Sequence, residues 1–183
     1  DNRDSTEVAQ CLRKVGTTYE RLGQHRKALE YHQKALQAYG RKHFRETRQS
    51  VAYCYWSLAA DYEELGQYRN ALKCFEGALK ICRKQYGHEN HERVAYCLLR
   101  LWALCGELDQ HSKSLRYLQQ ALNIYRVLHN SHNHAAAIDH CRRCMGALRS
   151  SLGNQQAADH CYADADSMSQ QIPIAPCYEG TEA

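Results

Sequence analysis

The sequence predicts an all-α fold, a right-handed solenoid of four antiparallel helix pairs that ends in a short non-helical tail. The main observation is an internal repeat of 43 to 44 residues, because periods of this size arise from stacked supersecondary units. Turn formers are also scarce, with 2 prolines and 10 glycines in 183 residues, which leaves little room for a β fold. Apolar residues recur at helical spacing, and no alternating strand pattern competes with them.

The repeat is clearest in the tetrapeptide VAYC, which occurs at residues 51–54 and again at 94–97. Near copies lie one period away on either side, as VAQC at 8–11 and IDHC at 138–141. The stretches that follow keep the same register in all four copies, so the tetrapeptide marks a unit rather than a cysteine site. We expect one repeat domain over residues 1–169 and a tail over 170–183, with units at about 7–49, 50–92, 93–136 and 137–169.

Each unit is expected to form two helices joined by a tight turn. In the second unit, Tyr55, Leu58, Ala59 and Tyr62 place apolar side chains along one face of the first helix. The turn has a residue that tolerates a left-handed backbone, namely Gly23, Gly66, Asp109 and Gly153 in the four units. The second helix repeats small residues seven apart with a bulkier one between, so neighbouring helices can approach closely: Ala28/His32/Ala35, Ala71/Phe75/Ala78, Ser114/Leu118/Ala121 and Ala158/Tyr162/Ala165.

Composition indicates a reducing, cytoplasmic location. Most of the ten cysteines lie inside helical stretches, where cysteine behaves as a small buried hydrophobe rather than as part of a disulfide framework. No apolar run approaches the roughly 18 residues that a transmembrane helix needs, so no membrane partner is expected. The chain begins with Asp1, and we expect it to be part of a longer protein. Residues 151–183 have a net charge of −5, against +4 for the whole chain.

The helix-pair pattern resembles that of the tetratricopeptide repeat family. The family signature is matched by Leu12, Val15, Gly16 and Tyr19, and again by Tyr55, Leu58, Ala59 and Tyr62. The 43-residue unit is longer than the usual one and is similar to the kinesin-light-chain type, whose connection is matched by YGHENHERVA at 86–95 except for its customary proline. The resemblance implies a curved solenoid whose first helices line a concave face that binds a short segment of a partner protein.

Carried onto this sequence, the resemblance places an aromatic floor between basic residues on the concave face. Such a surface suits an acidic peptide with a bulky apolar anchor. The alternative is that Trp56 and the tyrosines pack between repeats. The candidate peptide-binding residues are Arg13, Lys14, Thr17, Tyr53, Trp56, Ser57, Tyr96, Leu99, Arg100 and Arg143.

Two other modes of association remain open at this point, and two further partners are disfavoured. The repeat stack could instead be a self-association module that oligomerises a larger protein, and the tail could dock into the groove of its own or a neighbouring molecule. A clamp for the C-terminal carboxylate of chaperones is disfavoured, because Thr17, Ser57 and Tyr96 stand at three of its five places. Nucleic acid is unlikely as a partner, since acidic residues interrupt every basic stretch.

Catalytic, metal and cofactor sites are not expected. The sequence has no glycine-rich phosphate loop, no nucleophile elbow and no HExxH motif. Cys141 and Cys144 lie one helical turn apart near the histidines of segment 129–134, a possible zinc pair. However, Cys141 occupies the same repeat position as Cys54 and Cys97, which accounts for it structurally. We therefore predict a protein-interaction module rather than an enzyme.

Overall fold

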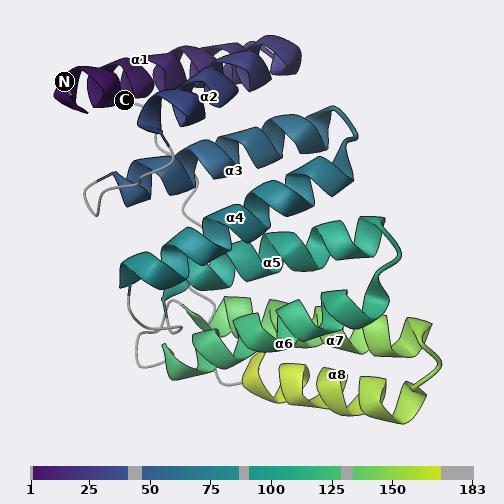
Figure 1. The fold of residues 1–183 in the computed structure, drawn as a ribbon. Coiled ribbons are helices and arrows are strands. Elements are labelled where there is room, and N and C mark those ends of the chain that lie inside the picture. Colours follow the sequence, from purple (N-terminus) through teal and green to yellow (C-terminus); the bar gives the residue numbers. More distant parts are fainter. Residues whose placement is uncertain (1, 41–46, 87–90, 129–133, 170–183) are drawn as a thin grey trace, which may run out of the picture.

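The computed structural model describes residues 2–40, 47–86, 91–128 and 134–169, and these residues form a solenoid of helix pairs (Figure 1). The pairs follow one another in chain order, with α1 and α2 at one end of the stack and α7 and α8 at the other. The all-α solenoid predicted from the sequence is therefore confirmed. The helices are α1 (Asn2–Arg21), α2 (His25–Tyr39), α3 (Arg48–Glu64), α4 (Tyr68–Tyr86), α5 (Glu92–Glu107), α6 (His111–Val127), α7 (Ala135–Ser151) and α8 (Gln155–Ser169).

The helices contact mainly their neighbours in sequence. Within a pair, α1 packs on α2, and the same holds for α3 with α4, α5 with α6 and α7 with α8. Between pairs, the second helix packs on the first helix of the next pair, as α2 does on α3. A smaller contact joins α1 directly to α3. Such nearest-neighbour packing is typical of a repeat solenoid, in which each unit is stabilised by the units beside it.

The turns within the pairs have the predicted backbone. Gly23, Gly66 and Gly153 have φ of 69°, 69° and 77°, and Asp109 takes the same left-handed conformation with φ of 55°. In each turn the next residue donates its backbone N–H to a carbonyl five residues earlier, as Gln67 does to Tyr62 at 2.8 Å. This bond closes the end of the first helix and sets the start of the second.

The core lies between the helices and uses the repeat positions that the sequence singled out. Ala28, Ala71, Ser114 and Ala158 are all completely buried where the two helices of a pair cross. Ser114, the polar member, donates its hydroxyl to the carbonyl of Trp102 at 3.0 Å. Cys54, Cys97 and Cys141 are also completely buried, and the cysteines within the described ranges are free thiols. The structural interpretation of the repeated cysteine is therefore confirmed for these three units.

None of the described helices combines the length and the apolar character needed to cross a bilayer.

Candidate functional site

Three aromatic side chains from two pairs meet on the first helices α3 and α5. The rings of Tyr53 and Trp56 on α3 are 5.0 Å apart between centroids, in an edge-to-face arrangement. Trp56 makes a second edge-to-face contact, at 5.6 Å, with Tyr96 on α5. Tyr53, Trp56 and Tyr96, called the aromatic cluster below, thus connect the second helix pair with the third.

The members of the aromatic cluster differ in exposure. Trp56 is half-buried, and its indole N–H donates to the sulfur of Cys97 at 3.2 Å, so this side chain packs between repeats. Tyr96 is 45% exposed, although its ring also lies 6.4 Å from the buried ring of Phe75. The two sequence interpretations therefore apply to different residues, since Trp56 supports the junction while Tyr96 presents a ring to solvent.

Arg93 adds a cation to this surface, and the sequence analysis missed it. Its guanidinium lies 5.2 Å from the ring centroid of Tyr53 and 5.9 Å from that of Tyr86, within the range of cation–π attraction. Arg93 directly precedes Val94, in a stretch interpreted as a connection between repeats. The available signal was its place one residue before the repeated VAYC, at the first turn of a helix.

His91 fixes the start of α5 and thereby the position of Arg93. The Nδ1 atom of His91 accepts a hydrogen bond from the backbone N–H of Arg93 at 3.1 Å, which caps the helix. The His91 ring also stacks on Tyr86, with centroids 3.6 Å apart. Burial, helped by the charge of Arg93, lowers the pKa of His91 and so favours the neutral ring that this cap requires.

Several predicted cations already have partners. Arg100 forms an ion pair with Glu63 and places its guanidinium 5.6 Å from the ring centroid of Phe75. Arg143 pairs with Asp139 at 3.0 Å on the same helix. These ion pairs reduce the net positive charge that Arg100 and Arg143 bring to the first helices, whereas Lys14 is exposed on α1.

Arg13 is partly buried and belongs to the packing of the first pair. It lies beside Tyr39. Burial raises the pKa of the Tyr39 hydroxyl, and the positive charge of Arg13 lowers that pKa in part. Thr17 donates its hydroxyl to the carbonyl of Arg13 at 3.1 Å within the same helix. Ser57 and Leu99 are half-buried, and Leu99 packs against the core. The structure thus gathers the candidates on α3 and α5, while those on α1 and α7 lie on other pairs.

Shallow hollows occur at the turn edge of the solenoid, away from the candidate residues. One is lined by residues 23–27 and Leu65, and another by residues 66–70 and Leu108. The two are equivalent in the repeat, since each lies between a turn and the leucine that precedes the next turn. Both are open to solvent and contain none of the predicted peptide-binding residues, so they do not mark that site.

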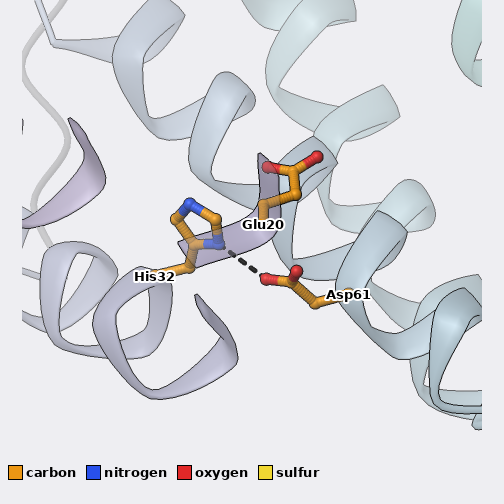
Figure 2. A group of neighbouring side chains, drawn as sticks. All are labelled: Glu20, His32 and Asp61. Carbon is orange, nitrogen blue, oxygen red and sulfur yellow. Dashed lines mark hydrogen bonds and ion pairs between the residues drawn. The ribbon is translucent and has the colours of Figure 1, made fainter. Parts of the chain in front are cut away.

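A cluster of polar side chains lies between the first and second pairs, and the sequence analysis did not predict it (Figure 2). Nδ1 of His32 lies 2.7 Å from Oδ2 of Asp61, and both side chains are completely buried. His25 places its Nδ1 3.4 Å from the other oxygen of Asp61. Glu20 is close by, and burial first, then the charge of Asp61, raises the pKa of its carboxyl.

Among the described residues, Glu20, His32 and Asp61 are near enough to one another to share a metal ion. The second nitrogen of His32 argues against that use. This Nε2 atom is buried without a hydrogen-bond partner and faces Gly16, whereas a ligating histidine normally donates its other N–H to an acceptor. The geometry fits a neutral His32 that donates its Nδ1 proton to ionised Asp61. We therefore interpret the cluster as a polar junction between two repeats.

Cys141 and Cys144, the possible zinc pair of the sequence, differ in their surroundings. Cys141 is completely buried in the core, and burial raises the pKa of its thiol to about 12. Cys144 is half-buried and packs against the edge of the core, and its sulfur lies 3.6 Å from Nε2 of His140. Residues 129–133, which contain other histidines of that hypothesis, and the tail 170–183 lie outside the described residues.

Solved structures with this fold come from several kinds of protein. BtubC (BKLC) from P. vanneervenii superposes with a TM-score of 0.78 at 21% identity, over 96% of this chain and 69% of that one. A putative kinesin light chain with TPR-like repeats from Podosopora anserina gives 0.73 at 15% identity, over 93% of this chain and 79% of that one. Aspartyl phosphate phosphatase F from Bacillus subtilis gives 0.70 at 16%, over 91% of this chain but only 41% of that one. At these identities the likeness shows the fold alone.

Family models agree with the repeat structure. No curated protein sequence matches the chain. Models of the tetratricopeptide repeat match residues 8–43 and residues 50–126, which together are more than half of the chain. The matched ranges contain most of the first three helix pairs, including the polar junction and the aromatic cluster. The chain belongs to the tetratricopeptide repeat family.

Proposed function

We propose that this chain is a non-enzymatic scaffold that binds a short segment of a partner protein at the aromatic cluster on α3 and α5. The observation that carries the proposal is Tyr96, a large side chain that stays 45% exposed while its neighbours hold the ring in place. Rigid, partly exposed aromatic rings on a fixed scaffold are the usual anchors of protein interfaces, because little side-chain entropy is lost on binding. The family and its structural neighbours support a role in protein interaction.

The partner segment is acidic and has one bulky apolar residue. The apolar residue would pack against Tyr96, and the acidic groups would lie near Arg93. Arg93 contributes because its charge, held over Tyr53, has no ion pair among the contacts described above. Arg100 and Arg143 contribute less than the sequence suggested, since their charges are balanced by Glu63 and Asp139. The preference for acidic segments therefore depends mainly on Arg93.

Fluorescence anisotropy with a labelled acidic peptide that contains one central tryptophan tests this proposal. Tyr96→Ala and Arg93→Glu should each weaken binding by about tenfold or more, equivalent to about 1.4 kcal/mol. Tyr117→Ala on α6 is the matched control, because this half-buried tyrosine lies on a second helix and should leave binding unchanged. A peptide with lysines in place of its acidic residues should bind more weakly than the acidic one.

Equal binding of the acidic peptide by the parent, Tyr96→Ala and Arg93→Glu would refute the assignment of the aromatic cluster. Circular dichroism of each variant confirms that the helices remain. Light scattering of the same samples separates peptide binding from self-association, because only the latter changes the mass of the free chain with concentration.

A further inference from the structure

One face of α1 exposes three side chains, and each of them occupies a position that recurs in the later units. Val8, Cys11 and Val15 are spaced by three and then four residues, so they lie on one side of the helix. Val8 is 53% exposed and Val15 is 39% exposed, and Cys11 is exposed as well. These three residues are called the α1 stripe below. An apolar row of this kind on a helix normally faces other protein.

The same three positions are buried in every later unit. Their counterparts in the second, third and fourth units are between 0% and 3% exposed, without exception. These counterparts are Val51, Val94 and Ile138 for Val8, Cys54, Cys97 and Cys141 for Cys11, and Leu58, Leu101 and Met145 for Val15. The later units thus show the role of these positions, because the residue types are alike, and among the described residues α1 differs only in having no helix packed over the stripe.

The cover at each internal junction is the second helix of the preceding pair. Ala35 and Tyr39 of α2 form one core cluster with Val51 and Cys54 of α3. At the next junction, Cys82 of α4 and Cys97 of α5 likewise belong to one core cluster. The covering helix repeats a buried small residue, a leucine directly after it and, three residues later, a buried tyrosine or cysteine: Ala35-Leu36-Tyr39, Ala78-Leu79-Cys82 and Ala121-Leu122-Tyr125.

A second copy of this chain does not offer that pattern at its other end. The helix that would meet α1 in a head-to-tail stack is α8. The repeat register places Asp166 where the covering helices have leucine, and Ser169 where they have Tyr39, Cys82 and Tyr125. Two polar residues at these places do not supply the apolar contacts that the leucine and the buried tyrosine or cysteine supply at the internal junctions.

We propose that the α1 stripe is a docking surface for the second helix of one further helix pair of this repeat class. The pair is joined ahead of α1 as α3 and α4 are joined ahead of α5. This surface is separate from the aromatic cluster, and its occupant is part of the array rather than a peptide ligand. Cys11 then becomes the buried junction cysteine that Cys54, Cys97 and Cys141 are in the later units.

The test lengthens the chain by its own second unit. Residues 50–92 are placed directly before Glu7, in place of residues 1–6, which reproduces the register of the α4–α5 junction. Alkylation of Cys11 by a maleimide, read by peptide mass spectrometry, should slow at least about tenfold relative to the parent, because labelling then requires the junction to open. In the lengthened chain with Val8→Lys and Val15→Lys, Cys11 should react as fast as in the parent.

Two results would overturn the proposal. One is parental reactivity of Cys11 in the lengthened chain, whether the added residues increase the helical circular dichroism signal or not. The other is a dimer of the parent chain, seen by sedimentation, that Val8→Lys abolishes, since the stripe would then belong to a second copy. Val8→Lys in the parent should leave the thermal unfolding midpoint unchanged, because Val8 is already 53% exposed there.

Discussion

At the junction between α2 and α3, His32 and Asp61 are completely buried and lie 2.7 Å apart between Nδ1 and Oδ2. The same repeat positions at the junction between α4 and α5 hold Phe75 and Leu104, each 1% exposed. One fold therefore accepts a polar pair or an apolar pair at the same place. Burial costs the polar pair its hydration, which their mutual interaction roughly offsets, whereas burial of Phe75 and Leu104 is favourable outright. The polar junction is thus vulnerable to loss of either partner alone.

The largest expected effect comes from removing one partner of the polar pair. Asp61→Leu installs the residue type of Leu104 but leaves His32 buried without its acceptor. We expect a loss of about 3 kcal/mol in the free energy of unfolding, measured by urea denaturation, because a buried N–H then has no acceptor. A loss below about 1 kcal/mol would contradict this expectation, because it would mean that water or His25 accepts the His32 proton in place of Asp61.

A substitution at Gly16 should have a smaller effect, and its cause is steric. A Cβ added to Gly16 would lie 2.5 Å from Cδ2 and Nε2 of His32, yet the equivalent Ala59 is tolerated and completely buried. Gly16→Ala should cost about 1–3 kcal/mol in unfolding free energy because the imidazole must move. Gly106→Ala, with nothing within 4 Å of its added Cβ, is the helical control and should be neutral or slightly stabilising. Equal effects at both glycines would argue against the tight contact with His32.

Converting the polar junction into the apolar one should have little net effect. His32→Phe combined with Asp61→Leu copies residue types that occur at these positions in later units. The free energy of unfolding should stay within about 1 kcal/mol of the parent or exceed it, since replacing both partners of a buried polar pair by apolar groups is often nearly neutral. If the double variant were as unstable as Asp61→Leu or less stable, the two residues would not act as a unit.

The smallest effect concerns Glu20 and depends on pH. Its pKa is raised from 4.5, first by burial and then by the charge of Asp61, so the folded protein binds this proton more tightly than the unfolded chain. Stability from this proton is fully present below pH 4.5 and is lost as pH rises through the folded pKa. Glu20→Gln should therefore stabilise the protein slightly at neutral pH and lose that advantage below pH 4.5. The unfolding midpoints of both proteins across this range provide the check, and a constant difference would contradict the assignment.

The sequence predicted the repeat, the helix pairs and the left-handed turns because each depends on local spacing that recurs four times. It also singled out Tyr53, Trp56 and Tyr96, whose rings meet in the structure, while their role in binding a peptide stays a prediction. It did not reveal that Arg100 and Arg143 have acidic partners, since Glu63 comes from another repeat and the pairing depends on side-chain conformation. Arg93 was missed because it was assigned to a connection. The contact of His32 with Asp61, 29 residues later, became visible only when the two helices were placed side by side.

The polar pair has a consequence for which repeats become neighbours. Similar units can dock in the wrong order, and such misassembly is a known failure of repeat proteins. If the first pair docked on α5 instead of α3, His32 would meet Leu104 and Asp61 would be left without an imidazole. The His32–Asp61 contact therefore favours docking of the first pair on α3 over docking on α5. A chain with its second and third units exchanged should form this wrong contact and show a lower unfolding midpoint, while the same exchange in the His32→Phe, Asp61→Leu background should be tolerated better.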